Sequence, residues 1–141
     1  MKLLWPVHLG ALVAALALAG GCGGEEGGGA GAAARLLPPR ARRSAREARA
    51  EATQIFNTRC SVCHGAGGAG DGPGSAGLTP QPRNLTEAAW HDSVEDSYIE
   101  RIIQYGGAAV GKSPAMPSNP DLGSRPEVLS ALREHIRSLR R

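Results

Sequence analysis

Two of the three cysteines in the chain lie in one five-residue stretch, Cys60-Ser61-Val62-Cys63-His64. The chain has 141 residues, which is enough for one ordinary domain and too few for two full-sized ones. Thiols three residues apart are neighbours on a helical turn, and the histidine follows directly. Whatever fold the chain adopts must therefore bring two sulfurs and an imidazole to one place.

The pattern Cys-x-x-Cys-His is the attachment motif of c-type haem. The two thiols can reach the two vinyl groups of one haem and form thioether bonds, and His64 then supplies an axial ligand to the iron. The sequence therefore predicts one haem c, held covalently by Cys60 and Cys63.

Three other interpretations of this stretch are weaker. A thioredoxin-like cysteine pair needs a βαβ context, and no alternating strand pattern occurs in the sequence. A structural zinc site needs four ligands, whereas the stretch supplies three. A disulfide between Cys60 and Cys63 would close a very small loop and would stabilise little.

Residues 47–141 resemble a class I monohaem cytochrome c of the small bacterial kind, in which Cys-x-x-Cys-His-Gly is followed by Gly-x-Gly-Asp-Gly-Pro. The continuation here runs from Gly68 to Pro73. The resemblance implies an all-α cytochrome c fold, with three to four helices wrapped around one covalently bound haem. Only 4% of the residues are aromatic, and such a haem would supply much of the missing core.

The resemblance also implies a methionine as the sixth iron ligand. Apart from Met1, the chain has one methionine, Met116, which lies in the proline-bracketed segment 113–117. A stiff loop can hold a thioether on iron, whereas such a loop is a poor place for a core-filling methionine. His91 and His135 are the alternative sixth ligands.

Three further residues match positions that adjust the haem site in the family. The resemblance implies that the carbonyl of Pro73 accepts a hydrogen bond from the outer nitrogen of His64. It also implies that Arg83 and Trp90 donate hydrogen bonds to the haem propionates. The alternatives are an exposed arginine and an ordinary core tryptophan.

Apolar periodicity predicts where the helices lie. The first helix leads into Cys60, and the resemblance implies that its Ala52 and Phe56 cross the last helix. The last helix is expected to begin at a capping Ser124. A middle helix is expected between Ser93 and Gly106-Gly107, with a short turn at 86–90. The expected apolar positions are Ala48, Ala52, Ile55 and Phe56 in the first helix, Val94, Tyr98, Ile99, Ile102 and Ile103 in the second, and Val128, Leu129, Leu132, Ile136 and Leu139 in the last.

Residues 1–21 are typical of a lipoprotein-like signal peptide. An apolar run, Leu3–Ala19, is followed by small residues that end at Cys22. This arrangement resembles the bacterial lipoprotein signal and implies that the thiol of Cys22 carries a lipid. The departure from that family is Ala19, where leucine is usual.

Two alternatives for this segment stay open. Ordinary secretion could use the small-x-small site Ala17-Leu18-Ala19. A permanent membrane span would need about 20 apolar residues, and Pro6, His8 and the glycines from Gly20 onward oppose it.

Residues 22–46 are predicted to form a disordered tether rich in Gly, Ala, Arg and Pro. Segment 35–51 carries six arginines against two glutamates, whereas 52–141 carries nine basic and nine acidic side chains. The basic run has no interleaved aromatics, so we expect no nucleic-acid partner. It either lies against anionic lipid or solvates the start of a helix.

Together these features predict a membrane-tethered periplasmic one-electron carrier with a His/Met-ligated haem. Its partners would be redox proteins, and a lipid anchor would hold it at a bacterial membrane. With both axial positions filled, the iron offers no place for a small-molecule substrate, so we do not expect an enzyme. The alternative is a haem-based sensor, or a module of a larger oxidoreductase, with a labile sixth ligand.

Overall fold

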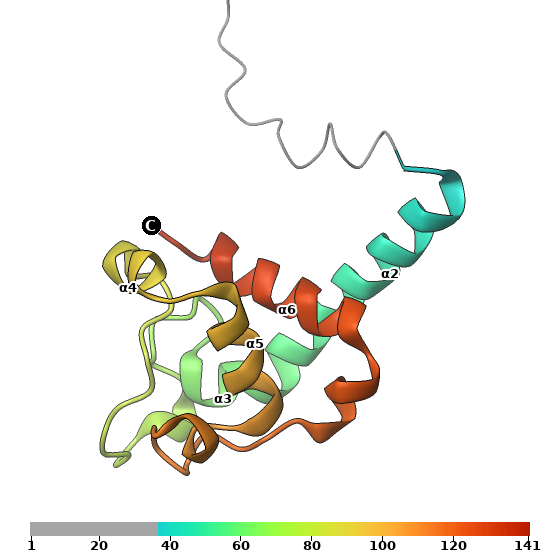
Figure 1. Cartoon of the computed structure of the whole chain (residues 1–141). Helices are drawn as coiled ribbons and strands as arrows, with labels where there is room; N and C mark the ends of the chain where they lie inside the picture. Colours follow the sequence, from blue (N-terminus) through green and yellow to red (C-terminus); the bar gives the residue numbers. More distant parts are fainter. Residues whose placement is uncertain (1–36) are drawn as a thin grey trace, which may run out of the picture.

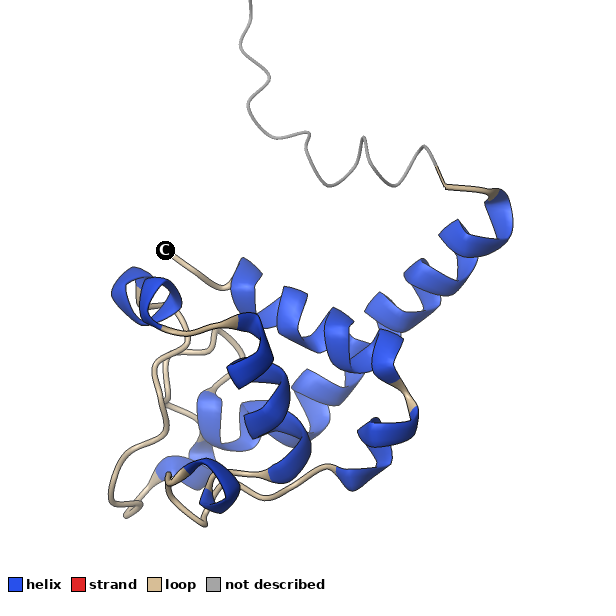
Figure 2. Ribbon diagram, viewed as in Figure 1, coloured by secondary structure: helices blue, strands red, loops and turns tan. Residues whose placement is uncertain are grey.

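The structure is a computed structural model that describes residues 37–141. The predicted signal peptide, Cys22 and the tether up to residue 36 lie outside the described residues. The described part contains no strand, which confirms the all-α prediction (Figure 1 and Figure 2). Its elements, in chain order, are α2 (Pro39–Ile55), η1 (Phe56–Cys60), α3 (Ser61–His64), η2 (Pro73–Ser75), α4 (Ala88–Ser93), α5 (Asp96–Tyr105), η3 (Ala108–Val110), η4 (Pro120–Ser124) and α6 (Pro126–Ser138).

Helix α2, the π-helical turn η1 and the short helix α3 run without interruption from Pro39 to His64. Pro39 stands in the first turn, where its missing N–H costs no hydrogen bond, and the helix-favouring residues Ala and Arg follow. The prediction that residues 39–46 belong to a disordered tether is therefore wrong. The glycine-rich stretch, whose composition prevents packing, ends before residue 39.

The core lies where helices α2 and α6 pack together, the most extensive contact between two elements. Phe56 is fully buried, and Ala52 is 1% exposed. The ring of Phe56 lies 4.6 Å from the ring of His135 on α6, centroid to centroid. This contact confirms that the first helix meets the last at Phe56, and it leaves His135 half-buried rather than on the open surface.

The middle of the chain differs from the prediction in its boundaries. Helix α4 ends at Ser93, whose hydroxyl donates to the carbonyl of Trp90 at 2.8 Å. Val94 is extended, so the next helix, α5, begins two residues later, at Asp96. Its predicted end is confirmed, because Gly106 adopts a φ of +81° and donates its N–H to the carbonyl of Ile102.

Helix α6 begins without the predicted serine cap. Pro126 occupies its first turn, so the N-cap position falls on Arg125, and no side chain caps it. Ser124 belongs to the preceding turn η4, where its hydroxyl donates to the carbonyl of Asp121 at 3.2 Å. The capping prediction is wrong because the proline starts the helix one residue too late for Ser124.

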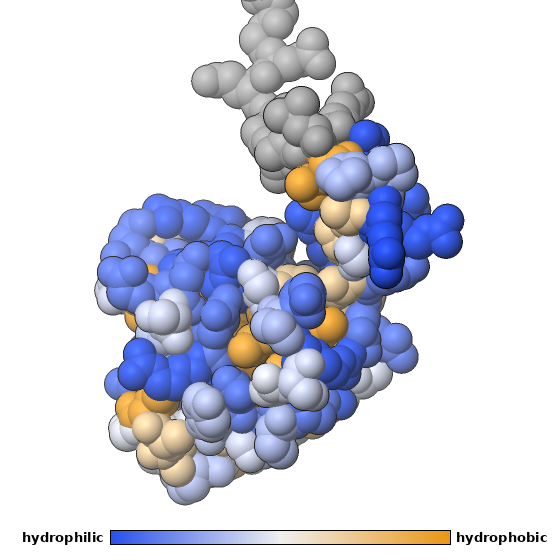
Figure 3. Space-filling view, turned by 45° about the vertical axis from the view of Figure 1, so that its right-hand side comes forward, coloured by the Kyte–Doolittle hydropathy of each residue, from blue (hydrophilic) through white to orange (hydrophobic). Residues whose placement is uncertain are grey.

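The surface seen in Figure 3 is mainly hydrophilic, with apolar residues scattered among polar ones. The large apolar side chains that are exposed are Leu37, Val62 and Tyr105. Within residues 37–141, no helix combines the length and the hydropathy needed to cross a membrane.

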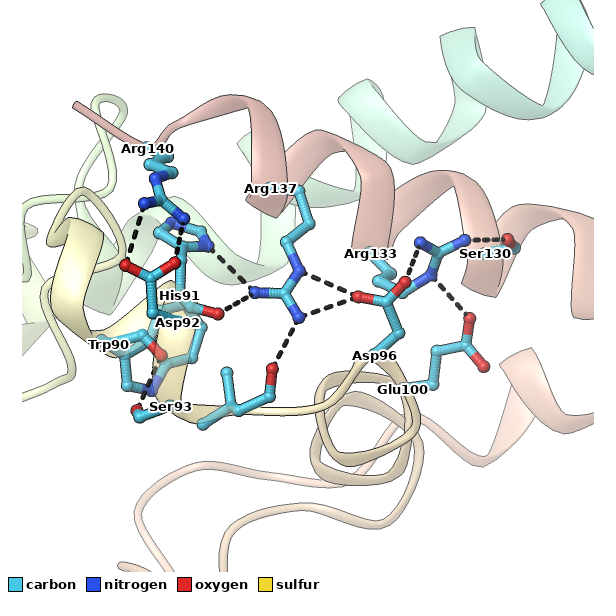
Figure 4. A network of polar contacts seen from close by, with 11 residues as sticks. Trp90, His91, Asp92, Ser93, Asp96, Glu100, Ser130, Arg133, Arg137 and Arg140 are labelled. Atoms are coloured by element: carbon cyan, nitrogen blue, oxygen red, sulfur yellow. Dashed lines mark hydrogen bonds and ion pairs between the residues drawn. The ribbon is translucent and has the colours of Figure 1, made fainter.

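A network of arginines fastens α6 to the corner between α4 and α5 (Figure 4). Arg137 donates to the carbonyls of His91 and Val94, at 2.6 and 2.7 Å, and to the carboxylate of Asp96 at 2.9 Å. Arg133 pairs with the same Asp96 carboxylate at 2.5 Å. Backbone carbonyls at a chain corner lack partners within a helix, so Arg137 fixes the position of this corner.

Candidate functional site

A cavity of about 1090 Å³ opens beside helix α3. Its size lies just above the range of about 300–1,000 Å³ that is usual for cofactor and ligand sites. Its walls come from the end of the first helix, the 78–83 loop, helices α4 and α5, and the 110–119 loop. The predicted site residues that line it are Cys60, Cys63, His64, Arg83, Trp90 and Met116.

Cys60, Cys63 and His64 reach the cavity from one helical segment. Cys60 ends the π-helical turn, and His64 is the last residue of α3. Neither Cys60 nor Cys63 forms a disulfide. Burial raises the pKa of the Cys60 thiol to about 11, against a smaller opposing effect of Arg59. A protonated thiol is a poor nucleophile, so burial opposes formation of a reactive thiolate at Cys60.

The segment that follows the motif keeps its helical turn in place. The N–H groups of Gly70 and Gly72 donate to the carbonyls of His64 and Cys63, at 2.8 and 3.1 Å. A Cβ atom on Gly72 would collide with the carbonyl oxygens of Ser61 and Val62. The glycine is therefore required, because only a residue without a side chain can lie this close to the helix.

The imidazole of His64 is oriented by a backbone carbonyl, and the carbonyl belongs to Arg83. Nδ1 of His64 lies 3.0 Å from that oxygen and must donate to it, which leaves Nε2 as the nitrogen available for a metal. Burial lowers the pKa of His64, against the opposing effect of this hydrogen bond. The ring is therefore neutral at pH 7, the form that binds metals.

Pro73 does not take the role predicted for it. It is not among the residues that line the cavity, and its carbonyl is not the partner of His64. The reason is the path of the chain: Gly72 and Gly74, on either side of Pro73, lie against the backbone of Val62. No sequence pattern marks Arg83 as the residue whose carbonyl accepts this hydrogen bond, because a residue of any type at that point of the loop would present the same oxygen.

Met116 lines the cavity from the loop that follows η3. The loop is fastened to the end of α5: the N–H of Gly107 donates to the carbonyl of Met116 at 3.0 Å, and the side-chain amide of Asn119 donates to the carbonyl of Ile103 at 2.9 Å. A Cβ atom on Gly107 would collide with the carbonyl of Ser113. Gly106 thus ends α5, and the missing side chain of Gly107 leaves room for the loop that carries Met116.

The two alternative sixth ligands lie elsewhere. His91 is 4% exposed, and its Nε2 donates to the carbonyl of Leu85 at 2.8 Å. His135 packs against Phe56. Neither histidine lines the cavity.

Arg83 and Trp90 both line the cavity. The guanidinium of Arg83 pairs with Glu87 at 3.2 Å and remains 55% exposed, so it can turn toward a ligand at small cost. Trp90 packs partly against the hydrophobic core and meets the ring of His91 edge-on at 4.9 Å.

The donor set fits a haem c and fits other metal sites poorly. Two thiols, one imidazole and one thioether line a single apolar-walled cavity. Among residues 37–141, no group of three or more His, Cys, Asp and Glu side chains is arranged to hold a metal ion. A structural zinc site therefore has no support from this part of the chain.

Comparison with known families agrees with this chemistry. The model of the cytochrome c family matches residues 49–140. The chain therefore belongs to the cytochrome c family, and its all-helical fold is that of a cytochrome c domain. Membership implies a haem c, haem-based electron transfer and redox partners. No curated protein matches the sequence.

Proposed function

We propose that the protein is a one-electron carrier whose haem c is attached through Cys60 and Cys63, with His64 and Met116 as the axial iron ligands. The observation that carries the proposal is that these four side chains line one cavity, although Met116 lies more than fifty residues from the others in sequence. When bound there, a haem iron supplies reversible one-electron redox chemistry.

The residues around the cavity have distinct parts in this proposal. The carbonyl of Arg83 accepts a hydrogen bond from Nδ1 of His64 and so fixes the tautomer that leaves Nε2 free for the iron. The loop that carries Met116 is held to the end of α5 by hydrogen bonds, and its thioether would serve as the second iron ligand. A Met/His ligand pair would raise the reduction potential. With both positions filled, no open coordination site is left for a substrate. In this proposal the side chains of Arg83 and Trp90, which line the cavity, would donate hydrogen bonds to the haem propionates.

We further propose that the domain works in the periplasm, tethered to a bacterial membrane through a lipid on Cys22. The support is the sequence: an apolar run followed by small residues and a cysteine, next to a glycine-rich segment. Replacing Cys22 with serine should move the protein from the membrane fraction to the soluble fraction. Unmutated protein that is already soluble would support ordinary secretion instead.

Binding of carbon monoxide tests the ligand set. The ferrous holoprotein should not bind carbon monoxide near neutral pH, because Met116 blocks the sixth position. Met116→Ala should bind it and should show a lower reduction potential. Ser118→Ala, an exposed change in the same loop but outside the cavity wall, should behave like the unmutated protein. Ready binding by the unmutated protein would replace the carrier proposal with a sensor or a catalytic module.

A further inference from the structure

The first turns of α2 project beyond the body of the domain and carry a concentration of arginines (Figure 1). Residues 39–50 contain five arginines and one glutamate. The family match begins at residue 49, so nearly all of this segment lies outside the matched domain. The haem site therefore does not account for these charges.

The arginines of this segment lie off the stripe of α2 that packs in the core. The core residues of α2 are Ala48, Ala52 and Ile55. At about 100° per residue, Arg42, Arg46 and Arg49 follow one another along a different stripe, and Arg43 lies beside it. We call Arg42, Arg43, Arg46 and Arg49 the arginine face. Figure 3 shows strongly hydrophilic residues over these turns.

Most of these charges have no acidic partner in the described part of the chain. In the body of the domain, arginines 59, 83, 125, 133, 137 and 140 all pair with carboxylates. Among residues 37–141, by contrast, no ion pair involves Arg40, Arg42, Arg43 or Arg46. Arg49 is the exception, because it pairs with Glu134 of α6 at 3.4 Å. Unpaired like charges on one helix repel each other, and an external anionic surface would relieve that repulsion.

The arginine face is too far from the cavity to be the surface through which electrons pass. Arg42 precedes Cys60 by 18 positions in an uninterrupted helical segment, which corresponds to about 27 Å at a rise of ~1.5 Å per residue. Figure 1 shows the projecting turns at one end of the molecule and the 78–83 and 110–117 loops, which line the cavity, at the other. A redox protein seated on the arginines would thus be remote from the haem.

We propose that the arginine face binds an anionic membrane surface, namely acidic phospholipid headgroups, and holds the domain with its cavity turned away from the lipid. An anionic membrane surface is flat and extended, so several arginines along a stripe can interact with it at the same time. Each arginine contributes to binding through its charge and needs no specific geometry. Cys22 lies 17 positions before Pro39, so a lipid there would keep the face near a bilayer. The proposal does not depend on that lipid or on the proposed ligand set.

The test is co-sedimentation of the holoprotein with vesicles. Residues 1–21 are replaced with an ordinary secretion signal and Cys22 with serine, so that no acyl chain contributes. The vesicles contain phosphatidylcholine alone, or equal parts of phosphatidylcholine and phosphatidylglycerol. We expect binding to the anionic vesicles only, and release by salt, because exposed charges are screened beyond a Debye length of about 10 Å at 0.1 M.

A matched pair of variants locates the contact. Arg42→Gln/Arg46→Gln should weaken partitioning onto anionic vesicles by about 25-fold, or about five-fold for each arginine removed. Arg101→Gln/Arg141→Gln removes the same charge from exposed positions of the body and should change partitioning far less. Unchanged haem spectra in all variants separate this result from a failure of the haem site.

Two results would overturn the proposal. One is equal binding of the Arg42→Gln/Arg46→Gln variant and its control to the anionic vesicles. The other is that the protein binds neither vesicle type, and the Arg42→Gln/Arg46→Gln variant slows electron exchange with a redox partner in solution. The arginine face would then be a protein-docking surface.

Discussion

Replacing Phe56 with alanine removes the largest fully buried side chain, at the point where α2 and α6 pack together. The ring is completely shielded from solvent and stacks at a tilt on His135 at 4.6 Å. Truncating a buried phenylalanine costs about 3–5 kcal/mol, because apolar burial is lost and a cavity remains. Since the total stability of a domain is about 5–15 kcal/mol, the variant should lose about a fifth of it or more.

Guanidinium unfolding of the holoprotein, followed by circular dichroism, measures this loss. Tyr105→Ala is the matched control, because it removes an aromatic ring of similar size that is 57% exposed, and it should change the free energy of unfolding by no more than about 0.5 kcal/mol. A loss below about 1 kcal/mol for Phe56→Ala would refute the argument that the α2–α6 contact is the centre of the fold.

Three further predictions concern the segments that hold the site. Gly72→Ala should destabilise the holoprotein by about 1–3 kcal/mol through overpacking against the motif helix and should lower haem incorporation, whereas Gly67→Ala, which has open space, should do neither; equal haem content in both would contradict this. Arg137→Gln leaves two corner carbonyls without their donor and should cost about 1–3 kcal/mol in chemical unfolding; an unchanged midpoint would show that water replaces it. The hydrogen bond from Arg137 lowers the pKa of Asp96, so Asp96→Asn should be less stable than the unmutated protein at pH 7. The difference in stability should shrink as the pH falls below the ordinary aspartate pKa of about 3.9 toward the folded pKa. A difference in stability that does not depend on pH would contradict this.

The sequence was most informative where chemistry requires a fixed spacing. Cys60, Cys63 and His64 must be neighbours on one helical turn to serve one haem, so the motif alone indicates the cofactor. Amphipathic periodicity likewise predicted the helices that carry Phe56 and Ile99, because burial of one face leaves a regular trace.

What the sequence could not predict depends on the path of the loops. The carbonyl that holds His64 comes from Arg83 rather than Pro73, and a backbone oxygen leaves no trace in residue type. The cap expected at Ser124 is absent because α6 starts at Pro126, which puts Arg125 at the N-cap position.

The extent of α2 was underestimated for a different reason. An arginine-rich segment next to a glycine-rich one is typical of a disordered, solvated chain. Arginine is, however, also a good helix former. The helix therefore extends back to Pro39 as part of one continuous segment that ends at His64.

We propose that Cys60 and Cys63 hold one haem covalently in the cavity that His64 and Met116 line. The intact mass of the denatured protein tests this attachment, with a Cys60→Ser/Cys63→Ser variant as control. We expect the mass of the mature chain plus one haem, retained after extraction with acidified solvent and absent from the variant. A haem that is extracted from the unmutated protein, leaving the mass of the bare chain, would contradict it.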